Sequence, residues 1–175
     1  MYTSTGLHLE FFHDMDHVKQ EQSAQLISEL SKGQTSHESR MVPLEPDDVL
    51  EKYLGLLATK KTDFAGYISA APLVDFKDYK MSKVGSLVVA ETHQNEGVGS
   101  ILVKTITKRL ETEKIIPFAF CNLRSVFAFF KAGYKPVSEG DLPPGQHSPY
   151  GNLGVFYPWH IPKPVPYSIP DHRDH

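Results

Sequence analysis

The sequence predicts a single α/β domain in which helices flank a mixed, mostly antiparallel sheet. Its 175 residues suit one domain with a sizeable core. Residues 84–121 follow the pattern strand, glycine-rich turn, helix, strand, which is typical of a parallel βαβ unit with a right-handed crossover. Residues 64–71 are also predicted to form a strand. Because no helix separates them from residues 84–90, these two strands should pair antiparallel.

The first sixty residues are predicted to hold one strand and two helices. A short apolar strand covers residues 7–12, and Asp14 and Asp16 are N-cap candidates for a helix from about Met15 to Leu30. Four residues are expected along one face of this helix: Val18, Gln22, Leu26 and Leu30. A second helix is predicted from Pro46 to about Lys60, because proline suits a first helical turn. Its expected apolar face comprises Val49, Tyr53, Leu56 and Leu57.

The central segment contains the strongest periodicity. Residues 72–83 look irregular, and the Val-rich run of residues 84–90 predicts a buried strand. An amphipathic helix follows to about residue 110. Its predicted buried face comprises Val98, Leu102, Ile106 and Leu110.

The last third is predicted as a strand, a short helix and a hairpin. The strand covers residues 115–121, the helix opens at Asn122 or Ser125, and Gly133 closes it in a left-handed conformation. The hairpin joins residues 134–137 to 153–157 through a long loop, and we expect Phe127 and Phe130 to be in the core. The predicted domain therefore spans residues 1–157, and residues 158–175 form an extended, proline-rich tail.

Composition excludes several classes of function. A formal net charge of −3 provides no basic field for nucleic acid. The nine histidines are scattered without metal-ligand spacing, so we expect no metal. Neither a signal peptide nor a membrane span is evident. The single cysteine, Cys121, fits a reducing compartment, and we expect the protein to be cytoplasmic.

The stretch from Gln94 to Ser100 predicts an anion-binding turn. The first amides of a helix have no internal partner and carry partial positive charge. Glycines at 97 and 99 remove the side chains that would keep a diphosphate away from those amides. The spacing is neither that of a dinucleotide fingerprint nor that of a P-loop.

Two motifs carry a resemblance to a known family. The pattern Gln-x-x-Gly-x-Gly in residues 94–99 resembles the pyrophosphate loop of the GNAT superfamily of acyl-CoA-dependent N-acyltransferases. A second segment begins with Asn122 and Ser125 and ends with Gly133 and Tyr134, and it is similar to the next GNAT motif. Two motifs in the family's order and structural context are more specific than either alone.

The resemblance implies a fold and a function. The central sheet would splay between strands 84–90 and 115–121, and acetyl-CoA would enter the wedge. The chain would move an acetyl group to a primary amine of a small molecule or peptide. The resemblance implies these cofactor-binding residues: Leu87, Val88, Val89, Gln94, Asn95, Glu96, Gly97, Val98, Gly99, Ser100, Asn122, Ser125 and Phe129.

The sequence departs from the family pattern at Phe129, where relatives usually carry a tyrosine that protonates the leaving thiolate. Three readings follow, in order of preference. The thiolate leaves without help, since a free thiol has a pKa near 8.5; another donor such as Tyr134, Tyr150 or Cys121 reaches it; or the chain binds CoA without catalysis. Glu91, with His93, is a candidate relay for the amine proton.

Two rival functions stay open. One is a non-catalytic CoA-binding module, which the phenylalanine at 129 motivates. The other is a partner-binding protein whose proline-rich tail is the working part. If that tail buries apolar surface on a second copy, the chain would form a homodimer.

Overall fold

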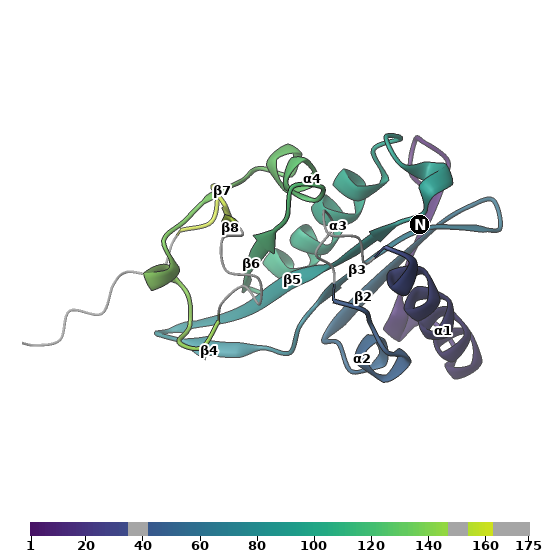
Figure 1. Cartoon of the computed structure of the whole chain (residues 1–175). Helices are drawn as coiled ribbons and strands as arrows, with labels where there is room; N and C mark the ends of the chain where they lie inside the picture. The colour runs from purple at the N-terminus through teal and green to yellow at the C-terminus, as the bar shows by residue number, and fades with distance from the viewer. Residues whose placement is uncertain (35–41, 147–153, 163–175) are drawn as a thin grey trace, which may run out of the picture.

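The computed structural model describes residues 1–34, 42–146 and 154–162. It contains an eight-stranded sheet in the order β1-β2-β3-β5-β6-β8-β7, with β4 paired to β5 (Figure 1). The strands are β1 (Leu7–Phe11), β2 (Leu54–Lys60), β3 (Asp63–Ala70), β4 (Val74–Phe76), β5 (Tyr79–Val89), β6 (Ile115–Cys121), β7 (Tyr134–Pro136) and β8 (Gly154–Pro158). The α-helices are α1 (His17–Gly33), α2 (Pro46–Leu50), α3 (Val98–Thr112) and α4 (Val126–Lys131). Short 3₁₀ turns are η1 (Phe12–Asp14), η2 (Glu91–His93) and η3 (Glu139–Asp141).

The helices cover both faces of the sheet. Figure 1 shows α3 and α4 on one face and α1 and α2 on the other. Neighbouring residues of β2 point to opposite faces of the sheet. Leu56 packs in the core beneath α3, and Leu57 packs in the core beneath α1 and α2. This alternation is the period of an extended strand that is buried on both faces. None of the helices in the described ranges has the length and hydropathy that a membrane span requires.

The predicted architecture is confirmed in its central part. Strands β3 and β5 pair antiparallel, and β5 and β6 pair parallel around α3. The predicted apolar face of α3 is fully buried. Gly133 has φ of +90° at the end of α4, the left-handed geometry that its sequence position predicted.

The predicted helix from Pro46 to Lys60 is wrong. Only α2 forms at its start, and β2 follows as a strand between β1 and β3. Leu56 and Leu57 are both buried, on opposite faces of the sheet. A strand that is buried on both faces does not alternate apolar with polar residues, so the sequence pattern does not reveal it. The irregular segment predicted at residues 72–83 is likewise a hairpin of β4 and β5, which turns at Lys77 with φ of +54°.

The predicted faces of α1 and α4 are also wrong in part. Val18 and Leu26 are 62% and 41% exposed. The helix instead buries four other residues: Ala24, Ile27, Ser28 and Ser31. Ser31 tolerates burial because its hydroxyl donates to the Ser28 carbonyl at 2.8 Å and accepts from the Leu44 amide at 3.0 Å. In α4, the expected core residues Phe127 and Phe130 are 67% and 45% exposed, whereas Phe129 is buried.

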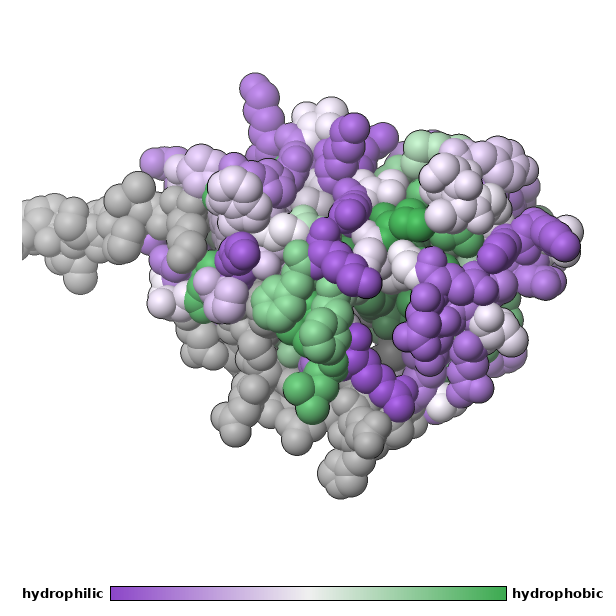
Figure 2. Space-filling model, turned by 90° about the horizontal axis from the view of Figure 1, so that it is seen from above, coloured by the Kyte–Doolittle hydropathy of each residue, from purple (hydrophilic) through white to green (hydrophobic). Residues whose placement is uncertain are grey.

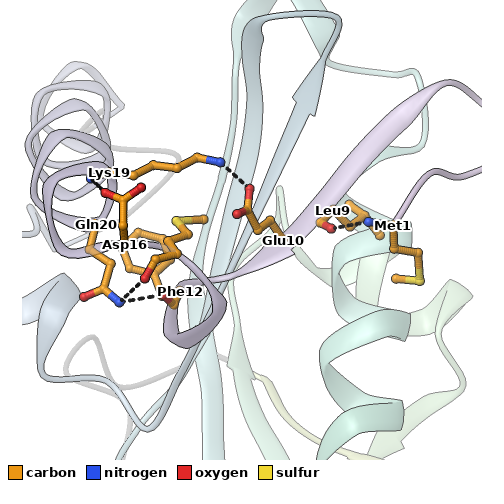
Figure 3. A network of polar contacts seen from close by, with 8 residues as sticks. Met1, Leu9, Glu10, Phe12, Asp16, Lys19 and Gln20 are labelled. Carbon is orange, nitrogen blue, oxygen red and sulfur yellow. Dashed lines mark hydrogen bonds and ion pairs between the residues drawn. The ribbon is translucent and has the colours of Figure 1, made fainter.

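Polar contacts fix the start of α1 against β1 (Figure 3). Asp16 is the N-cap, and its carboxylate accepts the Lys19 amide at 2.9 Å. The Lys19 ammonium pairs with Glu10 of β1 at 2.5 Å. The Gln20 side chain donates to the Phe12 carbonyl at 2.7 Å. Because these contacts span the turn between strand and helix, they set the angle at which α1 crosses the sheet.

The sheet forks between β5 and β6, as predicted. The two strands pair only where Lys80–Lys83 faces Ile115–Phe118. Beyond that point β6 pairs with β8 and β5 continues with β3 alone. The register of β3 and β5 shifts between Tyr67 and Ser69, and Ser86 has φ of +54° there, which marks a β-bulge. The fork leaves the two strand edges facing a wedge.

Candidate functional site

A cleft of about 860 Å³ fills this wedge. One wall is the splayed part of β5, and the other is the end of β6 with α4. The turn before α3 lies at its mouth. Seen from above (Figure 2), apolar and strongly polar side chains lie next to one another on the face that carries α4. A cleft of this size suits an elongated ligand with both apolar and charged parts.

The glycine turn places backbone donors at the cleft. Gly97 is the N-cap of α3 with φ of +82°, a conformation that favours glycine. A Cβ on Gly99 would lie 3.4 Å from Ala128 of α4 and 3.6 Å from Leu87 of β5. The first turn of α3 therefore sits close against both walls. Its amides and its macrodipole favour an anion at this end of the cleft.

The second motif forms the turn between β6 and α4. The Asn122 side-chain oxygen accepts the Ser125 amide at 2.9 Å and the Arg124 amide at 3.0 Å. The Ser125 hydroxyl accepts the Asn122 amide at 3.1 Å in return. Asn122 and Ser125 both line the cleft. The motif thus fixes the opposite wall, at the point where the first turn of α3 packs on α4.

Sequence comparison identifies this arrangement. The family model of the acetyltransferase (GNAT) family matches residues 22–134. The chain belongs to the GNAT acetyltransferase family. No curated protein matches the chain in sequence.

Solved GNAT structures share the fold at low sequence identity. A GNAT-family acetyltransferase from Staphylococcus aureus Mu50 is 14% identical with a TM-score of 0.61, over 86% of this chain and 98% of that one. One from Brucella melitensis, in complex with acetyl-CoA, is 14% identical with a TM-score of 0.60, over 91% of both chains. The catalytic domain of a Tetrahymena histone acetyltransferase in complex with coenzyme A is 16% identical with a TM-score of 0.58, over 90% of this chain and 95% of that one.

Most of the predicted cofactor-binding residues of this GNAT chain line the cleft. They are Leu87, Val89, Gln94, Asn95, Gly97, Val98, Gly99, Ser100, Asn122, Ser125 and Phe129. The side chain of Val88 instead lies in the core. Glu96 faces away from the cleft and pairs with Lys60 at 2.9 Å and with His93 at 3.2 Å. Its hydrogen bond to Lys60, and then that to His93, lower the pKa of the Glu96 carboxyl. Glu96 therefore braces the glycine turn against β2.

Of the predicted catalytic residues of this GNAT chain, Tyr134, Cys121 and Glu91 lie outside the cleft lining, whereas His93 belongs to it. Tyr134 is completely buried, its hydroxyl is 2.7 Å from that of Thr107, and burial raises its pKa far above the ordinary value. Burial also raises the pKa of the Cys121 thiol to about 12. Glu91 is exposed in η2, and Tyr150 lies outside the described residues. Their roles as proton donor or relay stay predictions without support from the geometry.

Phe129 lies in the core at the border of the GNAT cleft. It is 1% exposed, lines the cleft, and meets the Tyr134 ring edge-on with centroids 5.0 Å apart. An aromatic ring without a hydroxyl therefore faces the wedge where the family usually has a tyrosine. No proton can come from this position.

Sequence reasoning missed several polar residues of the GNAT cleft. The Gln34 side chain reaches from the end of α1 and donates to the Val89 carbonyl at 2.9 Å. At the far end the cleft is lined by Asp48, Lys52, Ser69 and Lys83. Asp48 and Lys52 fall in a segment that was predicted as helix, Lys83 in one predicted as irregular and Ser69 in a predicted strand, so no local pattern placed them together. Within the described residues no group of three or more acidic, histidine or cysteine side chains could hold a metal ion.

Proposed function

We propose that this chain transfers the acetyl group of acetyl-CoA to a primary amine by direct attack. The observation that carries the proposal is that a forked sheet and a glycine-rich helix start line one cleft. Solved neighbours of the same fold contain acetyl-CoA or coenzyme A, which supports the choice of donor. We also propose that residues 1–157 act as one domain, and that the activity is cytoplasmic, since a single cysteine suits a reducing compartment.

In this proposal each wall of the cleft binds one part of the donor. The pantetheine arm lies along the free edge of β5 and pairs with its backbone at residues 87–89 as an added strand would. The pyrophosphate accepts hydrogen bonds from the first amides of α3. Arg124 and Lys131 line the cleft on the α4 side and add positive charge near the phosphates. The acetyl group then lies toward the deep end of the fork.

The chemistry requires position and a donor for negative charge. The neutral amine attacks the thioester carbonyl, a C–N bond forms, and a backbone amide near Val89 stabilises the oxyanion. The C–S bond then breaks, and the amine proton passes to water. Because Phe129 cannot donate a proton, the thiolate leaves unassisted, which a leaving-group pKa near 8.5 allows.

Thiol release from acetyl-CoA in the presence of a broad panel of amines tests the proposal. We expect release that depends on the amine and an acetylated amine as product. Tight binding of CoA by calorimetry without turnover on any amine would favour the rival, a non-catalytic CoA-binding module. No binding of CoA would contradict both.

A glycine substitution tests the place of the pyrophosphate. Gly97→Ala forces a side chain into a left-handed conformation, which costs on the order of 1–2 kcal/mol and displaces the first amides of α3. We expect about tenfold weaker binding of acetyl-CoA, measured by calorimetry. Gly33→Ala is the matched control, because Gly33 lies at the end of α1 with open space around it. Equal affinities for the two variants would contradict this placement.

A further inference from the structure

Two lysines line the cleft near the point where β5 and β6 part. Lys83 is the last residue of β5 that pairs with β6, opposite Phe118, so it lies where the two strands part. Lys52 comes from the segment between α2 and β2 and lines the same cleft. Both side chains are partly buried. Burial, and then the charge of Lys52, lower the pKa of the Lys83 ammonium.

Neither ammonium group has a salt bridge within the described residues. Other lysines do, such as Lys60 with Glu96 and Lys80 with Asp75. Asp48 lines the same end of the cleft, but one of its carboxylate oxygens caps α2 by accepting the Glu45 amide at 3.0 Å. A partly buried cation loses hydration, and two of them repel each other, so an anion in this space is favoured.

The donor's phosphates cannot supply that anion. Val89 lies six positions after Lys83, which is about 20 Å along an extended strand. The glycine turn follows Val89, so the pyrophosphate proposed there lies at the opposite end of the cleft. Arg124 and Lys131 lie on the wall nearest that turn. The lysines at 52 and 83 therefore line the part of the cleft that lies away from the proposed phosphate site.

We propose that the acceptor is an amine that also carries a carboxylate, such as a free amino acid, and that Lys83 and Lys52 bind this carboxylate. The inference rests on the proposed acetyl transfer and names its substrate class. Ser69 is buried beside the same space, opposite Gly85, and offers a hydroxyl donor. The carboxylate takes no part in the bond changes. It holds the acceptor so that the amine nitrogen faces the thioester carbon.

Matched acceptors that differ in one charge test the substrate class. Suitable pairs are γ-aminobutyrate with butylamine and L-alanine with L-alaninamide, each assayed by thiol release at fixed acetyl-CoA and pH. The rates are compared per neutral amine, because the ammonium group of the amide is more acidic than that of the amino acid. We expect kcat/KM to be about tenfold or more higher for the carboxylate of each pair. Equal or higher values for the twins that lack the carboxylate would overturn the proposal.

Substitution of the lysines tests the binding residues. Lys83→Met and Lys52→Met should raise KM for the carboxylate acceptors about ten- to a hundredfold, with a small change for the twins that lack the carboxylate. Lys83→Arg should restore part of the difference. The control is Lys80→Met, an exposed lysine of the same strand that pairs with Asp75 at 3.3 Å. A loss of kcat that is equal for both members of a pair would assign Lys83 to proton transfer and overturn the proposal.

A binding measurement separates this inference from the proposed activity. If CoA binds but no amine causes thiol release, the proposed acetyl transfer is rejected. The proposed carboxylate site can still be tested by a binding measurement. Calorimetry of the CoA-loaded protein with N-acetyl-L-alanine and with its amide then decides. Tighter binding of the acid, lost in Lys83→Met, supports the site, and equal binding overturns it.

Discussion

At the scale of single residues, Tyr67 has a buried hydroxyl that lacks a hydrogen-bond partner within the described residues. Its ring is completely buried and meets Phe12 edge-on. The Ser69 hydroxyl is near enough to lower the pKa of Tyr67, but burial, which raises it, is the larger effect. An unpaired buried hydroxyl costs free energy on folding.

Removing this hydroxyl should therefore not destabilise the protein. We expect Tyr67→Phe to leave the free energy of unfolding unchanged or to raise it by up to about 1 kcal/mol, measured by urea denaturation. Tyr134→Phe is the matched comparison, because the Tyr134 hydroxyl bonds to Thr107 at 2.7 Å. That variant should lose about 1–2 kcal/mol. A larger loss of unfolding free energy in Tyr67→Phe than in Tyr134→Phe would contradict the conclusion that the Tyr67 hydroxyl is unpaired.

Cys121 predicts a dependence of stability on pH. Burial raises the pKa of its thiol from 9.0 to about 12, so the thiolate forms more readily in the unfolded chain. The protonated Cys121 thiol thus makes its full contribution to stability below about pH 9, and this contribution declines as the pH rises toward 12. We expect urea unfolding at pH 8, 9 and 10 to show a steeper decline for the wild type than for Cys121→Ala. Parallel declines would contradict the burial of the thiol.

At the scale of elements, the contact between α3 and the sheet depends on Gly66 of β3. A Cβ there would lie 2.9 Å from the Leu102 side chain and 2.9 Å from the Val88 carbonyl. The carbonyl belongs to the backbone of β5 and cannot turn away. Helix α3 therefore sits as close to β3 as it does because position 66 has no side chain.

Adding a methyl group at this position should push α3 away from the sheet. We expect Gly66→Ala to lower the free energy of unfolding by about 1–3 kcal/mol, measured by urea denaturation. Gly33→Ala, with nothing within 4 Å of the added Cβ, should change it little. If the two variants are equally stable, the close approach of α3 and β3 is contradicted.

At the scale of the whole molecule, the proline-rich tail tests which part of the chain acts. The structure describes this region only up to Pro162, where the Tyr157 hydroxyl donates to the Pro162 carbonyl at 3.3 Å. If the cleft is the working site, deletion of residues 163–175 should leave acetyl-CoA affinity and thiol release within about twofold of the full chain. Loss of both would favour the rival in which the tail is the active part.

Fold and site were predictable to different extents. The glycine turn and the apolar face of α3 are local signals, because both follow from residues within about four turns of one helix. The missed strand β2 is the opposite case, since its leucines are buried on both faces and their period shows neither a strand nor a helix. The wrong face of α1 has a similar origin, because Ser28 and Ser31 are buried through hydrogen bonds that the sequence does not reveal.

By itself, the sequence determined the family, the glycine turn at the mouth of the cleft and the order of the central elements. Short motifs encode those features, because each depends on residues that are close in sequence, at one helix start and in one turn. The tertiary structure alone decided which residues line the cleft near the point where β5 and β6 part. Lys52 and Lys83 are 31 positions apart, and the pairing of β2, β3 and β5, in which Leu54 faces Ala70 and Ala70 faces Val84, brings both lysines to the lining of one cleft. Contacts of that kind depend on chain topology, which no local pattern encodes.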